Sequence, residues 1–186
     1  MADRVAGAVG EHGDVPAAQV RAVTSVDEAL RRRLLACWTD VTNAGGAVGF
    51  VPPVTEDDIA PELDHLVLRV REGRAVLALL TVDGETAGFA VLARASSPLR
   101  QHWATVYRVQ VHPARQGAGL GRVLMAGVHA IAREEGLEFL RLGARDGTGA
   151  DTFYRLLGYE EVGRLPGAIR VAPGDDRDEI LLVCRL

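Results

Sequence analysis

Residues 106–131 constrain the fold more than any other stretch, because they combine a strand, a glycine-rich turn and a helix. Residues 106–111 are mostly β-branched or aromatic, which predicts a strand that enters the interior, carries Val109 and Val111 on one face and ends before Pro113. Beyond the glycines, apolar residues recur at the spacing of one helical face: Leu120, Leu124, Val128 and Ile131. The helix is therefore expected to begin inside the glycine loop.

The loop between this strand and this helix has the features of an anion-binding site. The start of a helix leaves backbone N–H groups without partners and carries the positive end of the helix dipole. Glycines at 117, 119 and 121 remove the Cβ atoms that would keep an anion from those amides. Arg115, Gln116 and Arg122 add side-chain donors. A ligand that carries a pyrophosphate fits this arrangement.

Two well-known glycine loops do not match the spacing. The dinucleotide-binding fingerprint needs G-x-G-x-x-G, whereas this chain has G-x-G-x-G, and the phosphate loop of nucleotide hydrolases needs a lysine, a residue type that the chain lacks. The remaining pattern is Gln-x-x-Gly-x-Gly after a strand that ends in Val-x-Pro. This pattern resembles the coenzyme A signature of the GNAT family of N-acetyltransferases.

A second motif and the order of predicted elements extend this resemblance from residue 19 onward. Residues 153–159, Phe-Tyr-Arg-Leu-Leu-Gly-Tyr, resemble the late motif of the family, in which an aromatic-tyrosine pair lies on a short helix that ends at glycine. The predicted order is β-α-α-β-β-β-α-β-α-β-β. The resemblance implies an α/β (mixed α+β) GNAT fold: a mixed, mostly antiparallel sheet of about seven strands, flanked by helices and opened as a V at the central strand.

Local signals give approximate bounds for the other elements. Capping boxes at Ser25–Glu28 and at Thr55–Asp58 predict two helices, which end before Gly45 and at Gly73. The segment 47–53 is too broken for regular structure and is expected either beside the acceptor site or as a packed connector. The remaining predicted elements are strands 19–23, 75–82 and 86–93 (the last two joined by a turn at Asp83-Gly84), strand 137–142, helix 150–157, and closing strands 159–164 and 179–186 separated by a loop.

Composition places this fold in one soluble domain. The chain has 186 residues, 48% of them hydrophobic, which predicts a single domain over 19–186 after a mobile leader at 1–18. The net charge is −4 and the arginines are scattered, so nucleic-acid binding has no support. The cysteines follow no disulfide or metal-ligand spacing, and no run resembles a signal peptide or a membrane span. We expect a cytoplasmic protein without a metal.

The resemblance implies that acetyl-CoA is the cosubstrate and that transfer to an amine is direct. The family usually places the oxyanion at a backbone N–H of the central strand, here Val109 or Val111, and a tyrosine hydroxyl, here Tyr154, near the sulfur of the coenzyme. We therefore expect Tyr154 to protonate the leaving thiolate. The residues expected to bind the coenzyme are Val109, Val111, Arg115, Gln116, Gly117, Ala118, Gly119, Leu120, Gly121, Arg122 and Tyr154.

The general base departs from the family pattern. Many relatives carry a glutamate near the start of the central strand, where this chain has Thr105, which cannot act as a base. The resemblance also implies an acidic residue where this chain has Thr148, which leaves Asp146 and Asp151 as the nearest carboxylates to that position. A chain of waters or the histidines at 102 and 112 are the alternatives.

Three functions stay open at this point: acetylation of a small-molecule amine, acetylation of a protein N-terminus or lysine, and binding of an acyl-CoA without turnover. The first is the favoured interpretation. The identity of the acceptor, the length of the acyl group and the formation of a homodimer are left open.

Overall fold

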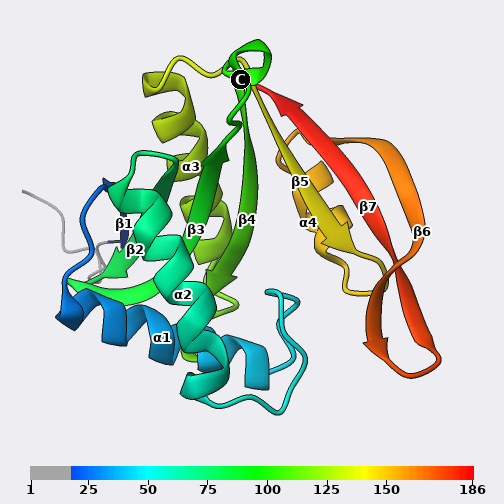
Figure 1. The fold of residues 1–186 in the computed structure, drawn as a ribbon, viewed down its shortest axis with the longest axis horizontal. Helices are drawn as coiled ribbons and strands as arrows, with labels where there is room; N and C mark the ends of the chain where they lie inside the picture. The colour runs from blue at the N-terminus through cyan, green and yellow to red at the C-terminus, as the bar shows by residue number, and fades with distance from the viewer. Residues whose placement is uncertain (1–17) are drawn as a thin grey trace, which may run out of the picture.

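The computed structural model describes residues 18–186, and its centre is one seven-stranded sheet with the order β1-β2-β3-β4-β5-β7-β6 (Figure 1). The strands are β1 (Ala18–Val23), β2 (Ala75–Val82), β3 (Glu85–Arg94), β4 (Trp103–Val111), β5 (Phe139–Arg145), β6 (Glu160–Ala172) and β7 (Asp175–Arg185). The helices are α1 (Glu28–Asn43), α2 (Glu56–Arg71), α3 (Leu120–Glu134) and α4 (Ala150–Arg155). This order of elements confirms the predicted one.

The sheet is antiparallel except where β4 meets β5, and these two strands part soon after they meet. Their parallel pairing covers three positions and ends at the pair Thr105 and Arg141. Beyond this point β4 stays with β3, while β5 continues against β7 through Arg145. The expected V-shaped opening therefore lies between β4 and β5, as Figure 1 shows.

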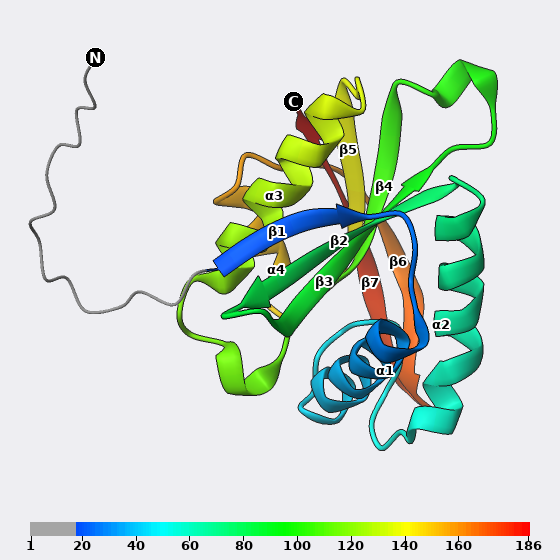
Figure 2. The ribbon, with the colours of Figure 1, turned by 90° about the vertical axis from the view of Figure 1, so that its left-hand side faces the viewer.

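Helices cover both faces of the sheet and enclose two separate apolar cores. Helices α1 and α2 lie over one face and α3 lies over the other, with α4 beside β5 (Figure 2). The core under α1 and α2 is centred on Trp38, Leu34 and Phe89, each fully buried. The core under α3 contains Leu124 and Val128, together with Val109 and Val111 from β4.

A β-bulge in β4 sets which of its side chains face each core. Between the pairs Val91–Tyr107 and Phe89–Gln110, β4 has one residue more than β3. Arg108 lies inside this bulge with φ 54°, which is uncommon for a residue with a side chain. Because the extra residue shifts the alternation by one, Val109 and Val111 join the core under α3 that Val106 already faces.

Local sequence signals predicted the start of α2 and the turn between β2 and β3 correctly. They placed the N-cap of α1 at the wrong residue. Thr55 and Asp58 form the predicted capping box, with the Thr55 amide donating to Asp58 Oδ2 over 2.8 Å. Asp83 and Gly84 both have positive φ, as the two-residue turn between β2 and β3 requires. The box predicted at Ser25–Glu28 is wrong, because Asp27 caps α1 by accepting from the Leu30 amide over 2.7 Å.

The end of the chain is more regular than predicted. The predicted loop between the closing strands is instead part of a long hairpin, β6 and β7, which turns at Gly174. Pro166 is tolerated because β6 is the edge strand and its register with β7 shifts at this point, where the Gly167 amide donates to Asp178 Oδ1 over 3.0 Å. The predicted leader lies outside the described residues except for Ala18, which begins β1.

Candidate active site

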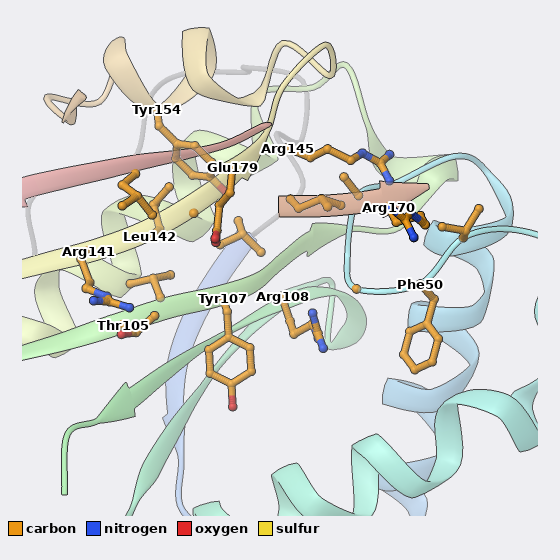
Figure 3. Close-up of a pocket in the computed structure, with 18 residues that line it drawn as sticks. Phe50, Thr105, Tyr107, Arg108, Arg141, Leu142, Arg145, Tyr154, Arg170 and Glu179 are labelled. Carbon is orange, nitrogen blue, oxygen red and sulfur yellow. The ribbon is translucent and has the colours of Figure 1, made fainter. Parts of the chain in front are cut away.

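Two cavities meet where β4 leaves β5. The first, the central cleft, has a volume of about 390 Å³ and lies in the V between β4 and β5, bordered by segment 47–51 and by the β6–β7 hairpin (Figure 3). The second, the loop groove, has a volume of about 520 Å³ and lies between the glycine loop and the start of α4. Val109 and Tyr154 line both cavities, so the two spaces adjoin at these side chains.

The glycine loop presents unpaired amides to the loop groove. The Gln116 side chain holds the loop against the end of β4, because its Nε2 donates to Val111 O over 2.9 Å. Gly117 and Gly119 have φ 84° and 76°, and Gly119 is the N-cap of α3. Within the described chain, the amides of residues 117–121 donate to no backbone carbonyl. The loop therefore fits a pyrophosphate as predicted.

Most of the predicted coenzyme residues surround this groove. Those that line it are Val109, Val111, Gln116, Gly117, Gly119, Leu120, Gly121, Arg122 and Tyr154. Arg115 and Ala118 do not line it, and Arg115 ends the short 3₁₀ turn before the glycines. Phe153 on α4 also lines the groove and packs against Gly121, where an added Cβ would lie 3.3 Å from the Phe153 ring. Sequence reasoning named Phe153 only as part of the late motif.

Tyr154 occupies the junction of the two cavities with a protonated hydroxyl. Its side chain is 9% exposed, and its ring packs against Phe153 and Tyr159 at centroid distances of 5.2 and 5.6 Å. Burial raises the pKa of Tyr154 to about 12. Its hydroxyl makes no hydrogen bond to any other residue in the described part of the chain, which leaves this donor available at the junction.

The bulge of β4 lies at the same junction, because Val109 lines both cavities. Neither Arg108 nor Val109 has a paired residue on β3 or β5. Thr105, where relatives carry a glutamate, lines the central cleft at the last paired position before the strands part.

The two carboxylates predicted as general bases lie away from both cavities. Asp146 follows β5 but turns toward the edge hairpin, where its Oδ1 lies 3.4 Å from Arg164 Nη1. Asp151 lies in the first turn of α4, and its Oδ2 is 3.7 Å from Arg155 Nε. Neither residue lines the central cleft or the loop groove.

A different carboxylate, Glu179, lines the central cleft. Glu179 lies on β7 opposite Arg145 of β5, and its side chain lies over Gly143, where a Cβ would overlap Glu179 Oε1. Figure 3 shows Glu179 and Tyr154 among the side chains that line the cleft. Sequence reasoning missed Glu179, because it is far in sequence from either motif. The alternation of β5, with buried Leu142 and Ala144 flanking Gly143, is the signal that marks the face on which it lies.

The described residues hold no group of three or more His, Cys, Asp or Glu side chains arranged for a metal ion. No helix in residues 18–186 is long and apolar enough to cross a membrane.

Segment 47–51 lies beside the cleft, with Phe50 among the lining residues, which is one of the two positions predicted for it.

Comparison with known proteins agrees with this architecture. The chain matches the model of the acetyltransferase (GNAT) family over residues 28–159. Three similar solved structures are a ribosomal-protein-alanine N-acetyltransferase from Brucella melitensis (24% identity, TM-score 0.69, covering 90% of this chain and 99% of that one), a GNAT-family acetyltransferase from Streptococcus pneumoniae (16%, 0.72, 91% and 99%) and a Salmonella typhimurium protein with its cofactor acetyl-CoA (21%, 0.69, 91% and 94%). The chain therefore belongs to the GNAT family, and it is an acetyl-CoA-dependent acetyltransferase.

Proposed function

We propose that this enzyme transfers the acetyl group of acetyl-CoA to a small-molecule primary amine by direct attack in a ternary complex. The observation that carries the proposal is the meeting of the central cleft and the loop groove at Val109 and Tyr154. An acetyl donor in the groove and an amine acceptor in the cleft would be held with their reacting ends together. Such positioning is the main requirement of a direct acyl transfer.

The glycine loop would hold the coenzyme. Gly117, Gly119 and residues 120–121 line the groove with amides that donate to no backbone carbonyl and could bind a pyrophosphate, and Arg122 supplies a charged donor at the groove wall. Bound acetyl-CoA supplies a thioester carbonyl as the electrophile. The Val109 amide, freed from the sheet by the bulge, is our candidate donor to the oxyanion.

Tyr154 and Glu179 would handle the protons of the transfer. An amine nitrogen forms a bond to the thioester carbon and loses its second proton to solvent, the carbon–sulfur bond breaks, and the departing sulfur takes a proton from the Tyr154 hydroxyl, which solvent then reprotonates. Glu179 removes the proton that the acceptor ammonium must lose before it attacks, directly or through one water. We assign the base to Glu179 in place of Asp146 and Asp151, because it lines the cleft and they do not.

The test is to mix the protein with acetyl-CoA and a pooled library of primary amines and to measure released thiol. Thiol release that depends on the amine supports the proposal. Acetyl-CoA binding by calorimetry without thiol release from any amine would favour a binding module.

The name of the Brucella melitensis relative supports a second candidate function, in which the acceptor is a protein N-terminus. A peptide that begins with alanine therefore belongs in the library, and preference for it over every small amine would replace the small-molecule assignment.

A further inference from the structure

We propose that the acceptor is a short primary amine that also carries an anionic group, a carboxylate or a phosphoryl group, and that Arg141 and Arg145 bind this anion. The inference rests on the proposed function and specifies its acceptor.

The charge of the central cleft is the first observation. Four arginines line it, Arg108, Arg141, Arg145 and Arg170, against a single carboxylate, that of Glu179. The formal charge of the whole chain is −4, so this excess of positive charge is local to the cleft. Clefts of one sign concentrate ligands of the opposite sign.

The arginines differ in how far other residues neutralise them. Arg170 makes two hydrogen bonds to Asp176, of 2.7 and 2.8 Å. Arg108 lies 3.4 Å from Glu62 Oε1 and stacks over Trp38 at 5.1 Å. Each of these two guanidinium groups therefore already has a carboxylate partner within the protein, although Arg108 Nε has no hydrogen-bond partner in the described part of the chain.

Arg141 and Arg145 make no ion pair within 4.0 Å in the described part of the chain. Arg141 lies over the Trp103 ring at 5.2 Å, which orients its guanidinium without neutralising it. Arg145 has only a longer-range electrostatic interaction with Asp175. Both guanidinium groups keep free donors, and a planar guanidinium binds a carboxylate or phosphoryl group through two parallel hydrogen bonds.

The alternation of β5 places these arginines on either side of Glu179. Arg141, Gly143 and Arg145 share the face that lines the cleft, while Leu142 and Ala144 are buried. The Glu179 carboxylate lies over Gly143, and Figure 3 shows it between Arg141 and Arg145. Each arginine is two residues from Gly143, roughly 7 Å along a strand.

This arrangement matches the charges of a zwitterion. An ammonium that pairs with Glu179 lies in the cavity that Tyr154 also lines, where acetyl transfer is proposed, and an anion a few bonds away reaches one of the arginines. A simple alkylamine carries no acceptor that could pair with these guanidinium groups. A long chain between the amine and the anion would place the anion beyond both arginines.

The experiment compares matched acceptors by calorimetry on the enzyme saturated with coenzyme A, so that binding is measured without turnover. One arm pairs glycine, L-alanine, L-glutamate and β-alanine with their primary amides. The other pairs 2-aminoethyl phosphate and aminomethylphosphonate with ethanolamine and methylamine. In at least one arm, we expect the acceptor that carries the anionic group to bind roughly 10- to 100-fold more tightly than the matched amine that lacks this group, as for a charge-assisted contact. The arm that responds identifies the anion.

Variants then locate the contact. Arg141→Gln or Arg145→Gln should remove most of the preference while leaving coenzyme affinity unchanged. Arg170→Gln, whose guanidinium is already paired, should change it less, and Arg185→Gln, outside the cleft, should leave it intact. Equal binding of amines with and without the anionic group would overturn the inference. A preference for the anionic group that survives in both the Arg141 and Arg145 variants would overturn it as well. Preferential binding without thiol release would uphold it and count against the proposed function instead.

Discussion

At the scale of single residues, Gly143 determines where the Glu179 carboxylate can lie. Residues that share its face of β5 have long side chains, and a Cβ at 143 would overlap Glu179 Oε1. The overlapped atom is the end of a flexible side chain, so Gly143→Ala can be accommodated by moving the carboxylate. Position 143 does not need a positive φ, which means that alanine adds no backbone strain there.

We therefore predict that Gly143→Ala and Glu179→Gln both lower kcat/KM by roughly 10²-fold near neutral pH, the lower end of the range for one general base. Activity should partly recover as pH rises and more of the amine is free. Gly163→Ala on β6 is the matched control, because its Cβ meets Leu181 at an ordinary 3.9 Å. Wild-type activity in both test variants would remove Glu179 from the mechanism.

Tyr154 is the second residue whose environment predicts a kinetic effect. We expect Tyr154→Phe to lower kcat roughly 10²-fold, as for loss of one general acid, and to leave coenzyme affinity nearly unchanged. Because burial raises its pKa to about 12, the hydroxyl stays protonated well past neutrality, and any loss of activity below about pH 10 must come from another group. A variant that keeps the wild-type kcat would show that Tyr154 only packs.

At the scale of elements, the glycine loop is flanked by two arginines, one before it and one at the start of α3, and they differ in whether they line the loop groove. Arg122 lines the loop groove and Arg115 does not. We predict that Arg122→Ala weakens coenzyme binding about 10-fold, whereas Arg115→Ala weakens it much less. Calorimetry with coenzyme A measures both, and each variant controls for the other. An equal loss in the two variants would mean that the coenzyme extends beyond the groove to the 3₁₀ turn.

Helix α3 also contacts the residue before β6 through a half-buried histidine. His129 lies 3.1 Å from the Tyr159 hydroxyl, and burial, with Arg133 adding, lowers the pKa of His129 below its ordinary value of 6.5. As pH falls through 6.5, the unfolded chain gains a proton at His129 that the folded chain does not yet bind, so the free energy of unfolding decreases.

We predict that His129→Gln makes this loss shallower, since glutamine can still bond to Tyr159 but does not titrate. Urea unfolding at pH 7.5 and pH 5.5 measures the difference in stability between the two conditions. His65→Gln, on the exposed face of α2, should keep the wild-type difference. A wild-type difference in the His129 variant as well would assign the pH dependence to other groups.

Elements whose signals are local could be predicted from the sequence. Asp83-Gly84 specifies a two-residue turn by its own φ angles, and the helix after Gly119 is marked by its apolar spacing. The β6–β7 hairpin was not predicted, because Pro166 normally argues against a strand and only its edge position and the bulge opposite Asp178 make it tolerable.

At the scale of the whole molecule, the cleft depends on pairings between distant segments. The glycine loop could be identified from the sequence because its candidate donors come from consecutive residues. Glu179 was missed because only the antiparallel register of β5 and β7 brings it over Gly143. Asp146 and Asp151 were predicted because they flank Thr148 in sequence, yet they lie near Arg164 and Arg155 and do not line the cleft.

The parting of β4 and β5 lets two ligands reach one point from different cavities, and this predicts the kinetic order of the reaction. In the described chain, no Cys, Ser or His lines the central cleft or the loop groove, and Cys37 and Cys184 are buried. A covalent acetyl-enzyme on a thiol, a serine hydroxyl or an imidazole therefore has no nucleophile in either cavity. Initial rates measured at several fixed acceptor concentrations should therefore give intersecting double-reciprocal lines, as a ternary complex requires. Mass spectrometry after incubation with acetyl-CoA alone should show no gain of an acetyl group. Parallel lines together with an acetylated residue would instead establish a two-step transfer and remove the need for the two cavities to be filled at once.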